Sequence, residues 1–497
     1  MFKNLLKILL GFLIIIILFI SYLSVFGIKT NKFNDLIKSQ IIQKDDRFNI
    51  ELDDVYIKLN IDEASFSLNS QNIKLYINKE YQKFTNVDLL IELDTIFQRN
   101  KKIKKIILNS ETNEIISLLK FIRSYKLNIP FLYLENSVTK GKITYNIIID
   151  FTDRNLEKIA FDGKIINSEL NILRKEKFKN VSFDFHYKDK ELDIKKLKFK
   201  YKNINFNSQN TDIHIKKNSI DIEGDLKNKI NVKFIKNFIK YDFEKYLDKY
   251  DELLSKSYFK IKLSNKFKLV DYKLKSKIDI SNLKLNFRNK NFKNYFVDYQ
   301  DTIILTNGEL EFNYSNKNKL DVKIISKYTL NEIYKPKDIY FEYNKIKSKE
   351  NFNFKIDLFE NKLIINEIDF HKKAGEELFL NLNLLKNKNN YQINEFRMFG
   401  GENNFIFKNV KFGKNYKVIN FDIIEANYLN KNNFANDVLM KQRNSNIEIY
   451  SKKIDLTFAL ERALKATDKV DFIQIFQDLN TAIIINVEKA KLDKDHN

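Results

Sequence analysis

The chain has 497 residues, of which 43% are hydrophobic and 14% aromatic, so it can bury a large core and wholesale disorder is excluded. It has no Cys, which excludes disulfides, zinc–thiolate sites and cysteine nucleophiles. Its formal net charge is +22, but Lys is spread along the whole chain between apolar residues. We interpret this charge as the solvated face of a sheet and predict no nucleic-acid partner.

The first element in chain order is an uncharged apolar run from Ile8 to Ile28. At about 1.5 Å per helical residue, this run can span a hydrocarbon core of roughly 30 Å. A cleaved signal peptide is the alternative, but its apolar region runs only about 7–15 residues and ends at small residues. We therefore predict an uncleaved transmembrane anchor over residues 1–30. Lys residues on both sides of the run leave its orientation open.

Helical periodicity is confined to short windows. Ile115, Leu118, Leu119 and Ile122 sit at i, i+3, i+4 and i+7, which predicts a helix packed over a sheet. We expect Pro130 to end this helix and strands to resume from Phe131. The other predicted helices cover Asn34–Gln43, Tyr241–Ser255, Leu456–Ala466 and Asp471–Leu479.

Most of the remaining chain is predicted to form strands. In Val181–Leu226, apolar and polar residues alternate with a period of two, which gives one apolar and one charged face. Turn-prone clusters recur about every 8–12 residues, as in a meandering sheet. Asp162-Gly163 and Asn307-Gly308 predict tight hairpins. The predicted fold class is mainly β: an N-terminal transmembrane helix, then an elongated, curled antiparallel sheet with a few short amphipathic helices.

Residues 31–497 are predicted to form one β-rich region, with a subdivision near 230–260 as one option. The last predicted strand, Ala482–Val487, has no obvious sequential partner. Either this strand pairs with an earlier one or the sequence is a truncated product of a longer gene, and we favour truncation.

Motifs that carry chemistry are missing from the sequence. The four His, at positions 186, 214, 371 and 496, have no metal-ligand spacing. Gly141-Lys142-Ile143-Thr144 resembles only the tail of a phosphate loop, because Asn136 stands where a Gly is expected. We therefore predict no enzymatic activity, no metal site and no cofactor.

Three stretches carry a resemblance to a known family. Phe161–Leu170 reads FDGKIINSEL, Ile220–Leu226 reads IDIEGDL, and Phe354–Phe370 continues the same alternation. With the single N-terminal apolar run and the long succession of amphipathic strands, they make the chain resemble the AsmA-like family, which includes the AsmA, TamB and YhdP proteins of Gram-negative envelopes. The resemblance covers nearly the whole chain, which is shorter than the long bridging members.

The resemblance implies a single-pass inner-membrane protein whose bulk lies in the periplasm. It implies that an apolar β-groove binds or conducts phospholipid acyl chains and contributes to outer-membrane lipid transport, homeostasis and biogenesis. The expected partners are the membrane and phospholipid. The alternative is a membrane-tethered structural or interaction protein of closed β-sandwiches, without lipid transfer, because a sandwich shows the same alternation. The candidate groove-lining residues are Phe183, Phe185, Tyr187, Leu192, Ile194, Phe199, Ile213, Ile215, Ile220, Ile222, Phe354, Ile356, Leu358, Leu380 and Leu382.

Overall fold

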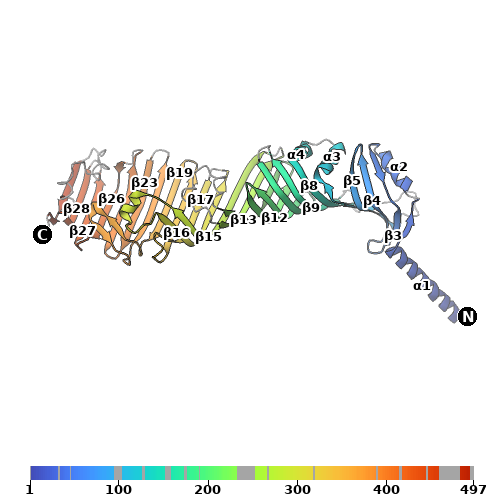
Figure 1. Ribbon diagram of the computed structural model, residues 1–497, viewed down its shortest axis with the longest axis horizontal. Helices are drawn as coiled ribbons and strands as arrows, with labels where there is room; N and C mark the ends of the chain where they lie inside the picture. Colours follow the sequence, from blue (N-terminus) through green and yellow to red (C-terminus); the bar gives the residue numbers. More distant parts are fainter. Residues whose placement is uncertain are drawn as a thin grey trace. The chain divides into compact units, whose positions relative to one another are not determined.

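A computed structural model gives the arrangement of the chain (Figure 1). The chain forms two compact units, Met1–Leu226 with Ile261–Val270 and Lys227–Lys260 with Asp271–Asn497. The residues that the structure describes are 2–31, 34–44, 46–93, 103–125, 129–151, 158–172, 176–189, 191–231, 252–265, 268–316, 319–387, 390–413, 417–443, 446–457, 460 and 482–492.

The first unit combines short helices with a succession of strands. Its helices are α1 (Phe2–Val25), α2 (Asn34–Lys44), α3 (Ile115–Tyr125) and α4 (Ile129–Ser137). Its strands are β1 (Ile28–Thr30), β2 (Phe48–Glu51), β3 (Val55–Asn60), β4 (Ser65–Ile77), β5 (Glu80–Glu92), β6 (Ile103–Ser110), β7 (Asn113–Glu114), β8 (Val138–Asp150), β9 (Lys158–Ile172), β10 (Glu176–Lys188), β11 (Glu191–Tyr201), β12 (Ile204–Ile215) and β13 (Ser219–Asn231), the last of which extends into the second unit.

Strand pairing in the first unit is antiparallel and nearly sequential. Strands β2 and β3 pair with successive parts of β4, and β1 pairs with β3. The ladder then runs through β4, β5, β6, β8, β9, β10, β11 and β12. Helix α3 packs on β5 and β8, as Figure 1 shows. Its buried Ile115 and Leu119 join Phe84, Ile143 and Tyr145 in the core of this unit.

The second unit is also built mainly of strands. Its elements are β14 (Glu252–Ser264), β15 (Leu269–Asn286), α5 (Lys290–Tyr295), β16 (Thr302–Ser315), β17 (Lys319–Thr329), β18 (Lys337–Ile346), β19 (Lys349–Asp357), β20 (Leu363–Ile365), a 3-10 turn η4 (Asn366–Ile368), β21 (Phe370–Lys372), β22 (Phe379–Asn387), β23 (Asn390–Gly400), β24 (Asn403–Phe412), β25 (Val418–Asn420), β26 (Ile423–Leu429), β27 (Ala435–Arg443), β28 (Asn446–Asp455), β29 (Ala482–Val487) and β30 (Ala490–Lys491), with β14 and β15 contributing residues to both units.

Pairing in the second unit runs antiparallel through β15, β16, β17, β18, β19, β22, β23, β24, β26, β27 and β28. The strand Ala482–Val487 does pair with an earlier one, because β29 lies parallel to β28. The prediction of a purely antiparallel sheet is therefore wrong at this edge. A parallel partner needs a connection of a dozen or more residues, and residues 456–481 provide it.

Neither predicted tight hairpin forms. Gly163 lies in the middle of β9, where a Cβ would come within 2.5 Å of the Phe185 ring, so this Gly makes room for a core aromatic. Asn307 and Gly308 lie inside β16 at a register shift against β17, with Asn307 at φ 49°. Asn307 and Gly308 together oppose the single Ser326 of β17, and two residues against one, with the first at positive φ, are typical of a β-bulge, so Asn-Gly bends a strand here.

The predicted helices fare unevenly. Helices α2 and α3 form as predicted, but Pro130 opens α4 where strands were expected to resume, in the first turn that tolerates Pro. The window Tyr241–Ser255 lies mostly outside the described residues, and its last four residues are strand in β14. Almost all of Leu456–Ala466 and all of Asp471–Leu479 also lie outside the described part.

In the part of the chain that the structure describes, no helix is both long and apolar enough to count as a membrane span.

Candidate functional site

The strand register of the second unit collects large apolar side chains on one face, which we call the apolar face. One row of directly opposed residues crosses six strands from β17 to β24. The row consists of Ile324, Phe341, Phe354, Leu382, Phe396 and Phe407. Because directly opposed residues of a sheet share a face, all six side chains point the same way.

This row is incompletely covered by protein. All six side chains are only half-buried, although each of their strands has a neighbour on both sides. In a closed sandwich, apolar side chains at the centre of a sheet interdigitate with a second sheet and lose contact with water. The apolar face of the second unit therefore keeps exposed hydrocarbon surface along its middle.

One end of this face is sealed by the connection between β19 and β22, residues 358–378, which we call the capping segment. Leu358 and Leu378 at its two ends are 1% and 0% exposed and pack with Phe370 and Met398. Tyr428 from β26 donates a hydrogen bond to the Ile368 carbonyl at 3.0 Å. The capping segment thus folds over one end of the face and closes it.

A second closed patch lies beside it, where residues 287–299 fold back on β15 and β17. Tyr299 and Tyr328 are buried there with Leu305, and Phe292 packs against the Tyr299 ring at 4.9 Å. The Tyr328 hydroxyl oxygen lies 2.7 Å from the Asp357 carbonyl oxygen and 2.6 Å from Asn361 Oδ1, so two acceptors share its single proton. Burial raises the pKa of Tyr328, which keeps this hydroxyl protonated as a donor. Sheet and capping segment are therefore joined by hydrogen bonds.

The opposite end of the apolar face carries charge. Lys345, Glu350 and Lys386 lie in register on β18, β19 and β22, and we call these three residues the charged rim. Glu350 accepts from Lys345 Nζ at 3.4 Å and from Lys386 Nζ at 3.3 Å. Burial would raise the pKa of Glu350, but the hydrogen bond and charge of Lys386 and the charge of Lys345 lower it overall. Two cations thus share one carboxylate at the open end.

Tyrosines flank the charged rim and phenylalanines lie deeper. Tyr391 pairs with Lys386 in the rim row, and Tyr314 lies two strands from Lys345 in the same row. Tyr343 and Phe352 form the next row, with ring centroids 4.9 Å apart. From rim to cap, the face therefore passes from charge through phenol to pure hydrocarbon.

The first unit has a corresponding apolar face, covered over part of its width. Phe84, Tyr145, Phe161 and Phe185 form a chain of ring contacts across β5, β8, β9 and β10, under α3. Farther along, Phe178, Phe199 and Phe206 continue the ring contacts over β10, β11 and β12, and these rings are only half-buried.

The candidate residues of the first unit share this face by register. Phe185 lies opposite Ile194, Tyr187 opposite Leu192, Leu192 opposite Ile213, and Phe199 opposite Phe206, while Phe183 and Ile215 lie two residues from Phe185 and Ile213 on the same strands. Gly224 of β13 lies against Thr211, and a hydrogen bond from Lys216 to the Ser219 carbonyl closes the turn, which places Ile220 and Ile222 beside Ile215 and Ile213. Phe185 is fully buried in the core and Ile215 is exposed.

The candidates of the second unit also lie together. Phe354 faces Leu382 and Ile356 faces Leu380, all half-buried. Leu358 is different, because the capping segment buries it completely. Phe185 and Leu358 lie in closed cores, since alternation reports the face but not what covers it.

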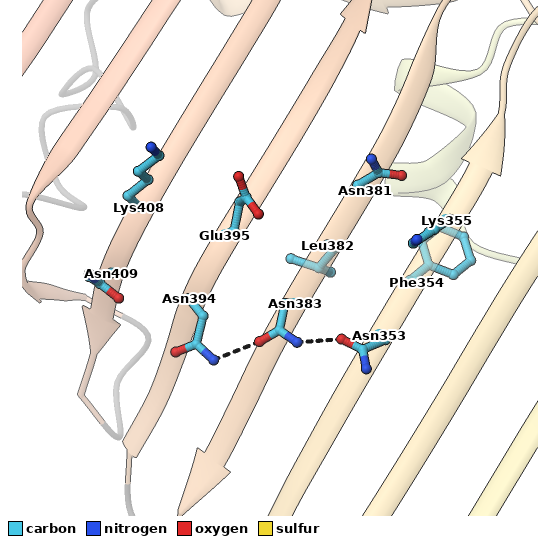
Figure 2. Close-up of a pocket in the computed structure, with 10 residues that line it drawn as sticks. All are labelled: Asn353, Phe354, Lys355, Asn381, Leu382, Asn383, Asn394, Glu395, Lys408 and Asn409. Atoms are coloured by element: carbon cyan, nitrogen blue, oxygen red, sulfur yellow. Dashed lines mark hydrogen bonds between the residues drawn. The ribbon is translucent and has the colours of Figure 1, made fainter.

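The other face of the second unit is polar (Figure 2). Asn383 Nδ2 donates to Asn353 Oδ1, and Asn394 Nδ2 donates to Asn383 Oδ1 at 2.6 Å. Lys355 and Lys408 stand on the same face around an open depression of about 620 Å³. This face therefore carries bonded amides together with the exposed Lys355 and Lys408.

Sequence reasoning missed the charged rim and the capping segment. The rim had a signal, because Lys345 continues the alternation of Phe341 and Tyr343, and Lys386 that of Leu382 and Leu384. The described residues contain no group of three or more His, Asp or Glu arranged to hold a metal ion. What the arrangement can do is bind hydrocarbon on one face, with charge at one end.

The chain matches no protein-family model, no curated protein and no solved structure.

Proposed function

We propose that the chain is a membrane-tethered lipid-binding protein whose apolar faces hold phospholipid acyl chains. It is anchored in the inner membrane by α1, with its bulk in the periplasm, and contributes to lipid transport to, and homeostasis of, the outer membrane. The resemblance to AsmA-like proteins supports the compartment and the pathway. The half-buried apolar row across β17 to β24 supports the ligand.

The half-buried row is the observation that carries the proposal. Side chains such as Phe354 and Leu382 keep contact with solvent in the middle of a sheet. Soluble monomers rarely leave contiguous apolar patches larger than a few hundred Å² uncovered. Acyl chains cover such a surface without any specific polar contact, which fits the row from Ile324 to Phe407, where every side chain is hydrocarbon.

The N-terminal helix supports the tether. All Leu, Ile and Phe side chains from Leu9 to Ile20 are at least 36% exposed, on every side of α1. A helix that is apolar all round is stable only inside a protein core or a bilayer. Because the described residues leave these side chains uncovered, we propose that lipid covers α1, although the helix falls short of the length and hydropathy expected of a membrane span.

The alternative, a tethered scaffold of closed β-sandwiches, has less support. It requires the middle of each apolar face to be dry, and the row containing Phe341 and Phe396 is not.

The test is native mass spectrometry of the full chain extracted in mild detergent. We expect bound phospholipid on the wild type and a loss of most of it from Leu382→Asp, because a carboxylate on the apolar face is costly to cover with hydrocarbon. Asn381→Asp is the matched control, since it places the same charge one residue away on the polar face. Circular dichroism checks that both variants fold.

A wild type that carries no phospholipid in repeated extractions contradicts the proposal. So does an equal loss from the two variants.

A further inference from the structure

The charged rim has more lysines than acidic groups, and acyl-chain binding alone gives this excess positive charge no role. Lys345 and Lys386 share Glu350, and their side chains remain 39% and 37% exposed. The β18–β19 turn adds Lys347, which is exposed and without an acidic partner among the described residues. This end of the apolar face is therefore positively charged.

The distance from the charged rim to the capping segment matches the length of an acyl chain. Ile356 carries the last half-buried side chain on this face before the capping segment. It lies six positions after Glu350, which is about 20 Å along a strand at roughly 3.3 Å per residue. One leaflet of a bilayer is about 15 Å of hydrocarbon, half of a roughly 30 Å core. An acyl chain that starts at the rim and runs along β19 therefore ends before the cap.

The order of side chains along this path matches the order of groups in a lipid. The lysines come first, with Tyr391 beside Lys386; Tyr343 follows, and then Phe354 and Leu382. Tyrosine suits the boundary between water and hydrocarbon, because its ring is apolar and its hydroxyl is polar. A lipid docked the other way would bury its headgroup against the capping segment.

We propose that the charged rim selects lipids with a net anionic headgroup, held at Lys345 and Lys386 while the acyl chain runs along β19 and β22 toward the capping segment. This inference rests on the proposed function and adds the class of lipid and its orientation. An ammonium group has three donors, and the contact with Glu350 uses one of those of Lys345.

The experiment loads the detergent-solubilised full chain with an equimolar mixture of phosphatidylglycerol and phosphatidylcholine of identical acyl chains. Native mass spectrometry reads the ratio of the two bound lipids. We expect the wild type to favour phosphatidylglycerol about tenfold, the ratio that about 1.4 kcal/mol produces. The double variant K345Q/K386Q should lose most of this preference, with bound phosphatidylglycerol falling toward the level of phosphatidylcholine.

The matched control is K355Q/K408Q, which removes two lysines from the opposite face of the same sheet and should keep the wild-type ratio. Glu350→Gln should raise the ratio, because it releases both ammonium groups from their shared acid.

The outcomes separate the two proposals. Lipid on the wild type without a headgroup preference overturns this inference and leaves lipid binding intact. An equal loss of preference in K355Q/K408Q shows a general charge effect and also overturns it. A wild type without any lipid overturns the proposed function, and this inference with it.

Discussion

At the scale of single residues, Lys372 is the most unusual side chain of the second unit. It is only 3% exposed, and its Nζ donates to the carbonyls of Phe359, Asn361 and Lys373 at 3.1, 2.9 and 2.8 Å. Burial lowers its pKa to about 8, against the opposing charges of Glu376, Asp357 and Glu360. A buried ammonium group therefore holds three backbone carbonyls of the capping segment together.

This pKa predicts a pH dependence of stability. Between pH 8 and 10.5 the unfolded chain keeps the Lys372 proton and the folded chain loses it, so this residue's contribution to the free energy of unfolding rises with pH in that window. The gain is at most about 3 kcal/mol, at 1.36 kcal/mol per pKa unit. Urea denaturation of the wild type and Lys372→Met across this window measures the difference between them.

The control is Lys373→Met, which changes an exposed neighbour and should leave the pH dependence as in the wild type. If the difference between wild type and Lys372→Met is flat from pH 8 to 10.5, the lowered pKa is wrong.

At the scale of elements, the capping segment depends on tyrosine hydroxyls from the sheet. Tyr328→Phe removes the donor to the Asp357 carbonyl and to Asn361 Oδ1 and leaves buried acceptors unpaired. We expect a loss of about 1–3 kcal/mol in the free energy of unfolding. Hydrogen exchange should become faster in residues 358–378 than in the wild type, while the exchange rates of the rest of the second unit change less.

Tyr340→Phe is the comparison for this prediction, because the Tyr340 hydroxyl bonds to Glu342 on the polar face. It should change stability by less than about 0.5 kcal/mol. Slow exchange retained in residues 358–378 of Tyr328→Phe would show that packing alone holds the cap.

The elements also show what the sequence could and could not predict. Alternation correctly placed Phe354, Ile356, Leu380 and Leu382 on one face, because side-chain direction is a local property of a strand. It gave no sign that residues 358–378 fold back over that face, since covering depends on contacts between distant strands. Asn307-Gly308 misled for the same reason, because a bulge and a hairpin share their local backbone and differ only in the partner strand.

At the scale of the molecule, the two units have separate cores. Leu119 is buried in the first unit with Phe84, and Leu305 in the second with Tyr328. Leu→Ala at buried sites costs about 2–5 kcal/mol. We expect Leu119→Ala to shift only the urea transition of peptides from the first unit, and Leu305→Ala only that of the second, as read by hydrogen exchange with mass spectrometry.

Equal shifts of both transitions in either variant would mean that the chain unfolds as one cooperative block. Sequence composition alone could not decide this, because no Pro-rich or Gly-rich linker separates the units.

The capping segment would restrict how lipid enters and leaves the second unit. If this face holds lipid as we propose, its sealed end leaves the side of the charged rim as the way in and the way out. Neighbouring lipid positions would then lie side by side across the strands, and a lipid would move from one to the next laterally, without reversing its orientation. Such a surface sets no fixed stoichiometry, so the number of bound lipids should rise with the lipid concentration.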